Sequence, residues 1–162
     1  MSTQAPKPRI AATTPEQIAW VGLLRAHASA VRRFNGDLIS EHGLTLNDYE
    51  VLLHLAHAPD RRLRRVDLAK SVLLTPSGIT RLLEGLELAG YVERASCASD
   101  ARVTYALLTD EGYDKLREAS LTHVEGIRSH FAERFSPEEL GTLAALLSRL
   151  PLDSAVDEDC SV

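Results

Sequence analysis

A stripe of apolar side chains near the N-terminus constrains most strongly what this chain can fold into. The stripe recurs at steps of three and four residues and consists of Trp20, Leu24, Ala28, Val31, Phe34 and Leu38. This spacing places the side chains on one face of an α-helix. A Thr14-Pro15-Glu16 start and Gly43 bound the predicted helix to residues 16–42. Such a helix would be about 40 Å long, too long to lie wholly on one small core.

Two further stripes predict a pair of helices near the C-terminus. Thr109-Asp110-Glu111 starts a helix over 110–135, and Ser136 with Glu139 forms a capping box before a helix over 137–150. The first stripe is Leu116, Ser120, His123, Ile127, Phe131 and Phe135, and the second is Leu140, Leu143, Ala144, Leu147 and Leu150. Nothing else in the chain is large enough to cover these faces. We therefore expect helices 16–42 and 110–150 to pair with those of a second copy in a homodimer.

The middle of the chain predicts three short helices followed by a β-hairpin. Asn47 opens the first helix, Ala58-Pro59-Asp60 ends it, and a short extended piece begins at Leu63. The next helices are Val66–Ser71 and the segment from Thr75-Pro76 to Gly90; the strands are Tyr91–Arg94 and Val103–Leu108, with a flexible tip at Ala95–Ala101. This order is that of a winged helix-turn-helix, here about residues 45–109. The expected fold is mainly α with a small β-hairpin wing (α+β), in a domain over 15–150.

The ends of the chain and its composition narrow the class of protein. Residues 1–14 are predicted to be a flexible arm and 151–162 an acidic disordered tail. With 162 residues, the chain is about one domain long. It has no apolar run of about 20 residues and no signal-peptide core, and Cys97 and Cys160 are too few for a disulfide scaffold. We expect a cytoplasmic protein without a membrane partner.

The charge distribution points to an anionic partner for the middle of the chain. The formal net charge is −5. Residues 61–102, however, carry eight Lys and Arg against five Asp and Glu, a local charge of +3 that leaves −8 for everything else. A basic segment inside an acidic protein is a local electrostatic footprint of nucleic-acid binding.

The helix after Thr75-Pro76 carries the residues suited to reading DNA. Its buried face is predicted to be Ile79, Leu82, Leu83 and Leu86, and its opposite face Ser77, Arg81, Glu84 and Leu88, with Thr80 at the edge. Thr75, Ser77 and Gly78 lie in the first turn, where free N–H groups and the helix dipole suit a phosphate. Arg81 is placed to reach guanine O6 and N7 in the major groove. An ordinary amphipathic surface helix would explain the same pattern.

The hairpin resolves this choice through a resemblance. Asp100-Ala101-Arg102, five residues and then Leu108-Thr109-Asp110-Glu111-Gly112 fit the pattern D-x-R-x5-L-T-x-x-G. Together with HGLTLNDYEVLLHLA and VDLAKSVLLTPSGITRLLEGLELAGYVER, this pattern resembles the MarR family of bacterial transcription regulators over about residues 16–150.

The resemblance implies a site and a mode of action. Thr75, Ser77, Thr80 and Arg81 would face the major groove, while Arg102, held by Asp100, would enter or flank the minor groove. Candidates for phosphate contacts are Arg64, Arg65, Lys70 and Arg94. The tip Ser96-Cys97-Ala98-Ser99 is less charged than in many relatives. The implied function is a homodimeric, sequence-specific regulator, a repressor that a small ligand releases from a pseudo-palindromic double-stranded DNA operator; the sequence does not separate repressor from activator.

Other chemistries are less well supported by the residues. A small aromatic or phenolic ligand would be lined by Trp20, Arg25, His27, Tyr49 and His54, although core packing or solvent exposure explains each of these residues as well. His123 and His130 lack an acidic cluster, so neither a metal nor another cofactor is predicted. No phosphate loop, G-x-S-x-G or placed nucleophile predicts an enzyme. Two alternatives remain open: a Cys97-based redox sensor, and a winged helix that binds protein rather than DNA.

Overall fold

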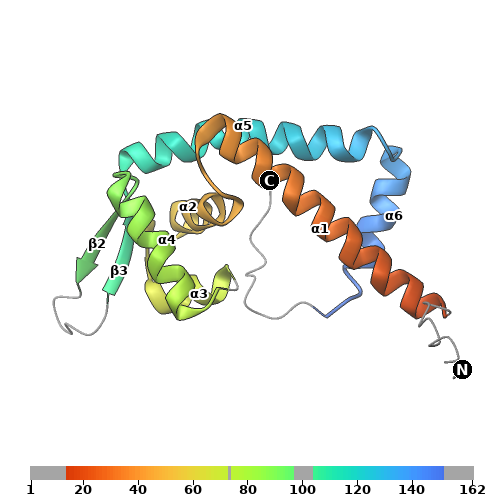
Figure 1. Ribbon diagram of the computed structural model, residues 1–162, viewed down its shortest axis with the longest axis horizontal. Helices are drawn as coiled ribbons and strands as arrows, with labels where there is room; N and C mark the ends of the chain where they lie inside the picture. The colour runs from red at the N-terminus through yellow and green to blue at the C-terminus, as the bar shows by residue number, and fades with distance from the viewer. Residues whose placement is uncertain (1–13, 73, 97–103, 152–162) are drawn as a thin grey trace, which may run out of the picture. The chain divides into compact units, whose positions relative to one another are not determined.

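The computed structural model describes residues 14–72, 74–96 and 104–151. The chain consists of two parts that are described separately: the first ends at Arg33 and the second begins at Phe34. One helix extends across this boundary. The elements in chain order are α1 (Pro15–His42), α2 (Leu46–His57), the 3-10 turn η1 (Pro59–Arg61), β1 (Arg62–Arg64), α3 (Arg65–Ser71), α4 (Pro76–Leu88), β2 (Val92–Ser96), β3 (Thr104–Leu108), α5 (Asp110–Ala132) and α6 (Pro137–Leu147). Figure 1 shows α2, α3, α4 and the strands gathered at one end of α5, with α6 at the other end.

The predicted order of elements is confirmed, and several boundaries differ. The helix α2 begins at Leu46 rather than Asn47, because Thr45 is its N-cap and forms a capping box with Asp48. The strand β2 runs on to Ser96, so Ala95 and Ser96 belong to a strand rather than to the tip. Helices α5 and α6 each end three residues earlier than expected, at Ala132 and Leu147.

The sheet has three strands rather than the two of the predicted hairpin. Its order is β1-β3-β2 and both pairings are antiparallel, with Leu63 of β1 and Arg94 of β2 on either side of Ala106. The three residues of β1 are too few to show an alternating pattern, so the sequence indicated only an extended piece there. Pairing with β3 fixes the start of α3 against the base of the wing.

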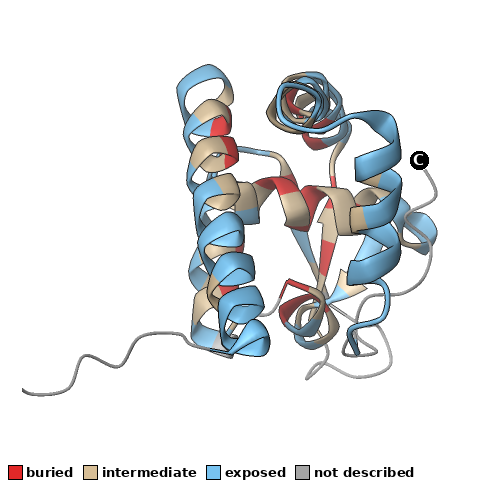
Figure 2. Ribbon diagram, turned by 90° about the vertical axis from the view of Figure 1, so that its right-hand side faces the viewer, coloured by how far each residue is buried: buried red, intermediate tan, exposed pale blue. Residues whose placement is uncertain are grey.

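One core holds this end of the molecule together. It lies between α2, α3, α4, the sheet and the first half of α5, and Figure 2 shows its buried residues on the inward faces of the elements. Leu38, Leu52, Leu55, Leu68, Leu83, Val51 and Val92 are its largest fully buried side chains. The part of the stripe at the end of α1 therefore joins the core through Leu38. No helix of the described ranges has the length and hydropathy needed to cross a membrane.

The L-T-x-x-G motif fastens the start of α5 to the turn after α4. The Thr109 hydroxyl donates to the Gly90 carbonyl at 2.8 Å and accepts from the Gly112 amide at 2.9 Å. The Thr109 amide donates to the carbonyl of Tyr91 at 3.1 Å. A Cβ on Gly112 would meet that carbonyl oxygen at 2.1 Å, so only glycine allows this close approach. The motif is thus a structural lock at the base of the wing.

A strained turn precedes β1. Asp60 and Arg61 both adopt positive φ, at 54° and 52°. This conformation costs about 1–3 kcal/mol for a non-glycine residue and persists only where surrounding contacts hold it. The Arg61 guanidinium forms an ion pair with Asp110 at 3.0 Å and lies 4.3 Å from the centre of the Tyr113 ring. These contacts join the strained turn to the start of α5.

The far half of α5 and all of α6 have no comparable core. No residue of α6 is buried, and Leu121, Val124 and Leu146 are 74%, 57% and 53% exposed. Between the two helices lies an apolar groove of about 380 Å³ lined by Ile127, Arg128, Phe131, Ala132, Leu140, Leu143, Ala144 and Leu147. We call this surface the α5–α6 groove.

Candidate nucleic-acid interface

The helix α4 presents two opposite faces, as the sequence predicted. Ile79, Leu83 and Leu86 are buried in the core, whereas Leu82 is only half-buried. The opposite row is exposed and consists of Ser77, Arg81, Glu84 and Leu88, with the half-buried Thr80 beside it. Leu88 is 90% exposed. We call these four exposed residues the outward row.

The first turn of α4 is built as expected. Thr75 is the N-cap, and its hydroxyl oxygen accepts from the Gly78 amide at 3.1 Å. The hydroxyl groups of Thr75 and Ser77 lie 3.2 Å apart. The helix therefore begins with two hydroxyl groups at the end where its dipole favours an anion. This arrangement suits a phosphate oxygen.

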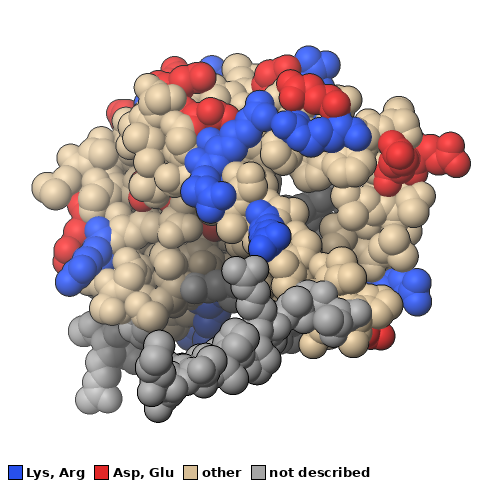
Figure 3. Space-filling view, turned by 45° about the vertical axis from the view of Figure 1, so that its right-hand side comes forward, with Lys and Arg blue, Asp and Glu red and all other residues tan. Residues whose placement is uncertain are grey.

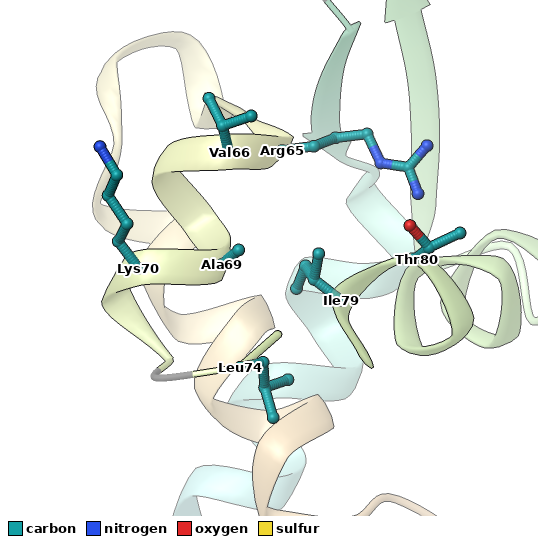
Figure 4. A pocket seen from close by; sticks show the side chains of 7 residues that line it. All are labelled: Arg65, Val66, Ala69, Lys70, Leu74, Ile79 and Thr80. Carbon is teal, nitrogen blue, oxygen red and sulfur yellow. The ribbon is translucent and has the colours of Figure 1, made fainter. Parts of the chain in front are cut away.

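A hollow of about 400 Å³ separates α3 from α4. Its lining residues are Arg65, Val66, Ala69, Lys70, Leu74, Ile79 and Thr80. Figure 4 shows the Arg65 side chain extending from the start of α3 to the hydroxyl side of Thr80, whereas Lys70 points away from the hollow. The Nη2 atom of Arg65 is buried without a hydrogen-bond partner among the described residues. Arg65 is thus a half-buried neighbour of α4, and Lys70 is an exposed cation.

Two of the predicted phosphate contacts already have anionic neighbours. The Nε–H of Arg64 donates to Asp67 at 2.7 Å, and this hydrogen bond raises the pKa of the Arg64 guanidinium. Arg94 on β2 lies 3.4 Å from Glu87, so an ion pair joins the wing to α4. Ion pairs that lie this close to solvent contribute little to stability.

The remaining wing residues lie outside the described residues. These are Cys97, Asp100 and Arg102; Cys160, near the C-terminus, also lies outside the described residues. On the face drawn in Figure 3, acidic and basic side chains lie next to one another along the upper edge. Glu125 and Arg128 of α5 form an ion pair at 2.9 Å.

The five residues proposed to line a ligand pocket belong to two parts of the chain that are described separately. Trp20, Arg25 and His27 are exposed residues of the part that ends at Arg33. Tyr49 is buried in the core, with its hydroxyl 3.3 Å from that of Ser120. His54 is half-buried on α2. Core packing therefore explains Tyr49.

Two histidines of α5 form an aromatic cluster that sequence reasoning did not find. The ring centres of His123 and His130 each lie 5.5 Å from that of Phe34, and His123 lies 4.7 Å from Tyr49. Burial lowers the pKa of His123 below its usual value of 6.5. The spacing of seven residues did predict that both side chains lie on one face. In the part of the chain that the structure describes, no three His, Cys, Asp or Glu side chains are placed to hold a metal ion.

These elements form a winged helix-turn-helix domain. The helices α3 and α4 lie on either side of the hollow, the strands β2 and β3 of the wing come next in the chain, and long helices precede and follow this unit. The family model described as MarR family matches residues 42–103. Sco3205, a MarR family transcriptional regulator from Streptomyces coelicolor whose crystal structure is in complex with DNA, is 34% identical. The match covers 84% of this chain and 88% of that one, with a TM-score of 0.76.

Two further proteins are similar. AbsC, a MarR family transcriptional regulator from the same organism, is also 34% identical, over 83% of this chain and 90% of that chain, with a TM-score of 0.74. The HTH-type transcriptional repressor YetL of Bacillus subtilis (strain 168) is 34% identical over 67% of this chain, and the match spans 64% of the length of YetL. The chain belongs to the MarR family of winged-helix transcriptional regulators.

Proposed function

We propose that this protein regulates transcription as a homodimer that binds double-stranded DNA through α4 and the wing. The outward row of α4 carries the proposal, since it is exposed, begins at an anion-favouring helix end and contains Arg81. A relative of 34% identity, Sco3205, has been crystallised with DNA, which supports the same partner here. In this reading Thr75, Ser77 and Gly78 meet a phosphate, and Arg81 reaches a guanine edge with Thr80 beside it.

The other cations fix the position of the protein on the duplex. Arg64, Arg65, Lys70 and Arg94 flank α4 on β1, α3 and β2, where they would contact phosphates without reading sequence. Arg102, held by Asp100, would reach the minor groove from the wing. Minor-groove contacts distinguish fewer base pairs, so Arg102 would contribute more to affinity than to base preference.

The homodimer accounts for the exposed apolar surface. The α5–α6 groove and the exposed Leu121 and Val124 leave apolar side chains in water on neighbouring stretches of the chain, and surfaces of this kind mark interaction sites. A second copy would cover this surface and bring a second α4. Two reading helices about one DNA turn apart, roughly 34 Å, then match a pseudo-palindromic operator.

A small aromatic or phenolic ligand would act as the effector of a repressor. A ligand that prefers a dimer with another spacing of the reading helices shifts the population away from the DNA-binding form. Trp20, Arg25, His27, Tyr49 and His54 stay the proposed contacts. The name of YetL, a repressor, supports the direction of control.

Selection of bound genomic fragments, followed by fluorescence anisotropy across a salt series, tests the function. We expect an enriched pseudo-palindrome whose binding constant falls with salt at a slope of about −0.9 per phosphate contacted in the log–log plot. Binding that is equally tight at low and high salt, or a pool without a common motif, would refute DNA reading. A winged helix that binds protein through apolar contacts, and does not bind DNA, would give a pool without a common motif.

A further inference from the structure

An acidic residue stands in the middle of the outward row of α4. Glu84 is exposed and lies one helical turn beyond Arg81. Among the described residues neither side chain has a hydrogen bond or an ion pair. A carboxylate at this place repels DNA phosphates and weakens binding to every sequence alike.

Glu84 remains unpaired although its spacing from Arg81 allows an ion pair. Elsewhere in the molecule, the same spacing of three residues joins Arg64 to Asp67 at 2.7 Å and Glu125 to Arg128 at 2.9 Å. Glu87, the next acidic residue of α4, pairs with Arg94 at 3.4 Å. Arg81 and Glu84 are therefore both available to an external partner.

Glu84 also has no visible part in holding the fold. Its side chain lies on the face opposite to Ile79 and Leu83, which are buried in the core. It sits in the interior of α4, away from the N-cap Thr75 and the C-cap Ala89. Neither packing nor capping explains a charge that opposes DNA binding.

We propose that Glu84 is a specificity-determining residue that accepts a hydrogen bond from the N4 amino group of a cytosine in the major groove. The proposal rests on the proposed function and deepens it. Cytosine presents an amino donor at the major-groove edge, which a carboxylate accepts, whereas guanine presents the acceptors O6 and N7, which a carboxylate repels. A repulsive element of this kind raises the contrast between the correct sequence and its competitors.

The spacing of the pair predicts how the two contacts are arranged on DNA. Three residues of α-helix advance about 4.5 Å, and successive base pairs are about 3.4 Å apart. Arg81 and Glu84 therefore address neighbouring base pairs, the first donating to a guanine and the second accepting from a cytosine. Each half-site should contain both bases close together.

Glu84→Gln gives the sharpest test, because glutamine forms a bidentate contact with adenine N6 and N7. We expect selection from a randomised DNA pool to change the preferred base at one position per half-site from cytosine to adenine. At that position the ratio of the two affinities should change by about tenfold or more, which is the size of a base contact. Affinity for unrelated DNA should rise slightly as the negative charge is lost.

Glu93→Gln is the matched control. Glu93 is an exposed carboxylate on β2 in the same basic segment, and it also lacks an ion pair among the described residues. If charge alone matters, both variants change binding equally and base preference is kept, which overturns the proposal. An unchanged base preference in Glu84→Gln overturns it too. Failure of the parent protein to select any motif would instead refute the proposed function, and equal urea midpoints of parent and variants establish that folding is unaffected.

Discussion

The two ends of α5 differ in how they are stabilised. The first half packs into the core with α2 and the sheet, where Leu116 and Ala119 are buried. The second half carries Val124 and Ile127 in the open and meets α6, which has no buried residue. One continuous helix thus has a half that packs on the chain's own core and a half whose apolar surface stays exposed, which the proposed homodimer would cover. Substitutions in the two halves should therefore have different consequences.

Replacing Gly112 by alanine should cost the most stability. The added Cβ would meet the Tyr91 carbonyl oxygen at 2.1 Å and the Leu108 side chain at 2.8 Å, and the backbone must shift at the Thr109 lock. We expect a loss of more than about 4 kcal/mol in urea unfolding, the range of a severe backbone clash.

The matched control is Gly141→Ala in α6. A Cβ on Gly141 meets no atom within 4 Å. Alanine should stabilise this helix interior by about 0.5–1 kcal/mol. Equal effects of the two substitutions would show that the Tyr91 carbonyl does not restrict position 112.

Replacing a leucine should have different effects in the winged-helix core and in the α5–α6 groove. Leu83 is fully buried, so Leu83→Ala should cost about 2–5 kcal/mol at any protein concentration. Leu143 lines the α5–α6 groove, so Leu143→Asp should separate the dimer while the winged-helix core stays folded. Sedimentation and the concentration dependence of the urea midpoint measure both effects, and a Leu143→Asp protein with the parent's mass would show that the groove is not the interface.

Arg81→Ala should affect DNA binding and leave stability unchanged, because Arg81 is exposed and has no hydrogen bond or ion pair among the described residues. The loss on the selected operator should be about 1–3 kcal/mol, with relaxed preference at one base position per half-site. Arg102→Ala should weaken binding with a smaller change in base preference. Anisotropy at one fixed salt concentration measures both, and parent-like binding by both variants would reject the interface.

The smallest expected effect is a pH dependence of stability at the boundary between the two halves of α5. Burial lowers the pKa of His123 below 6.5, so between the folded and unfolded pKa values the unfolded state binds more protons. Stability should be complete above pH 6.5 and should fall as the pH drops toward the folded pKa. Burial also raises the pKa of Glu50 above 4.5, which acts in the opposite sense.

The variant His123→Leu isolates this contribution. It should flatten the fall in the urea midpoint below pH 6.5 relative to the parent, while Glu50 acts equally in both proteins. A parallel pH profile in the two proteins would show that His123 does not titrate as its burial requires.

Local sequence signals predicted the helix starts well. Thr75, Thr109 and Ser136 each cap a helix as expected, because a side chain that accepts from a backbone amide three residues on acts over a single turn. The two faces of α4 followed from periodicity for the same reason, with Leu82 less buried than the pattern suggested. The outward row of the candidate site was therefore readable from the sequence.

Contacts between distant segments could not be read in the same way. The pairing of β1 with β3, the Arg61 contact with Asp110 and the histidine cluster around Phe34 join residues that are far apart in the chain. The ligand-binding residues proposed from the chemistry of their side chains belong to two parts of the chain that are described separately.

The order of the helices, their caps, the exposed face of α4 and the family of the chain all follow from local signals in the sequence. Each depends on spacing within one turn or on a motif of fixed length, so neighbours along the chain suffice. The tertiary structure, by contrast, is what requires glycine at position 112, because Tyr91 approaches it from another element. It also decided that Arg64 and Arg94 have acidic neighbours whereas Arg81 and Glu84 stay unpaired among the described residues, since side-chain pairing depends on which surfaces the fold brings within reach.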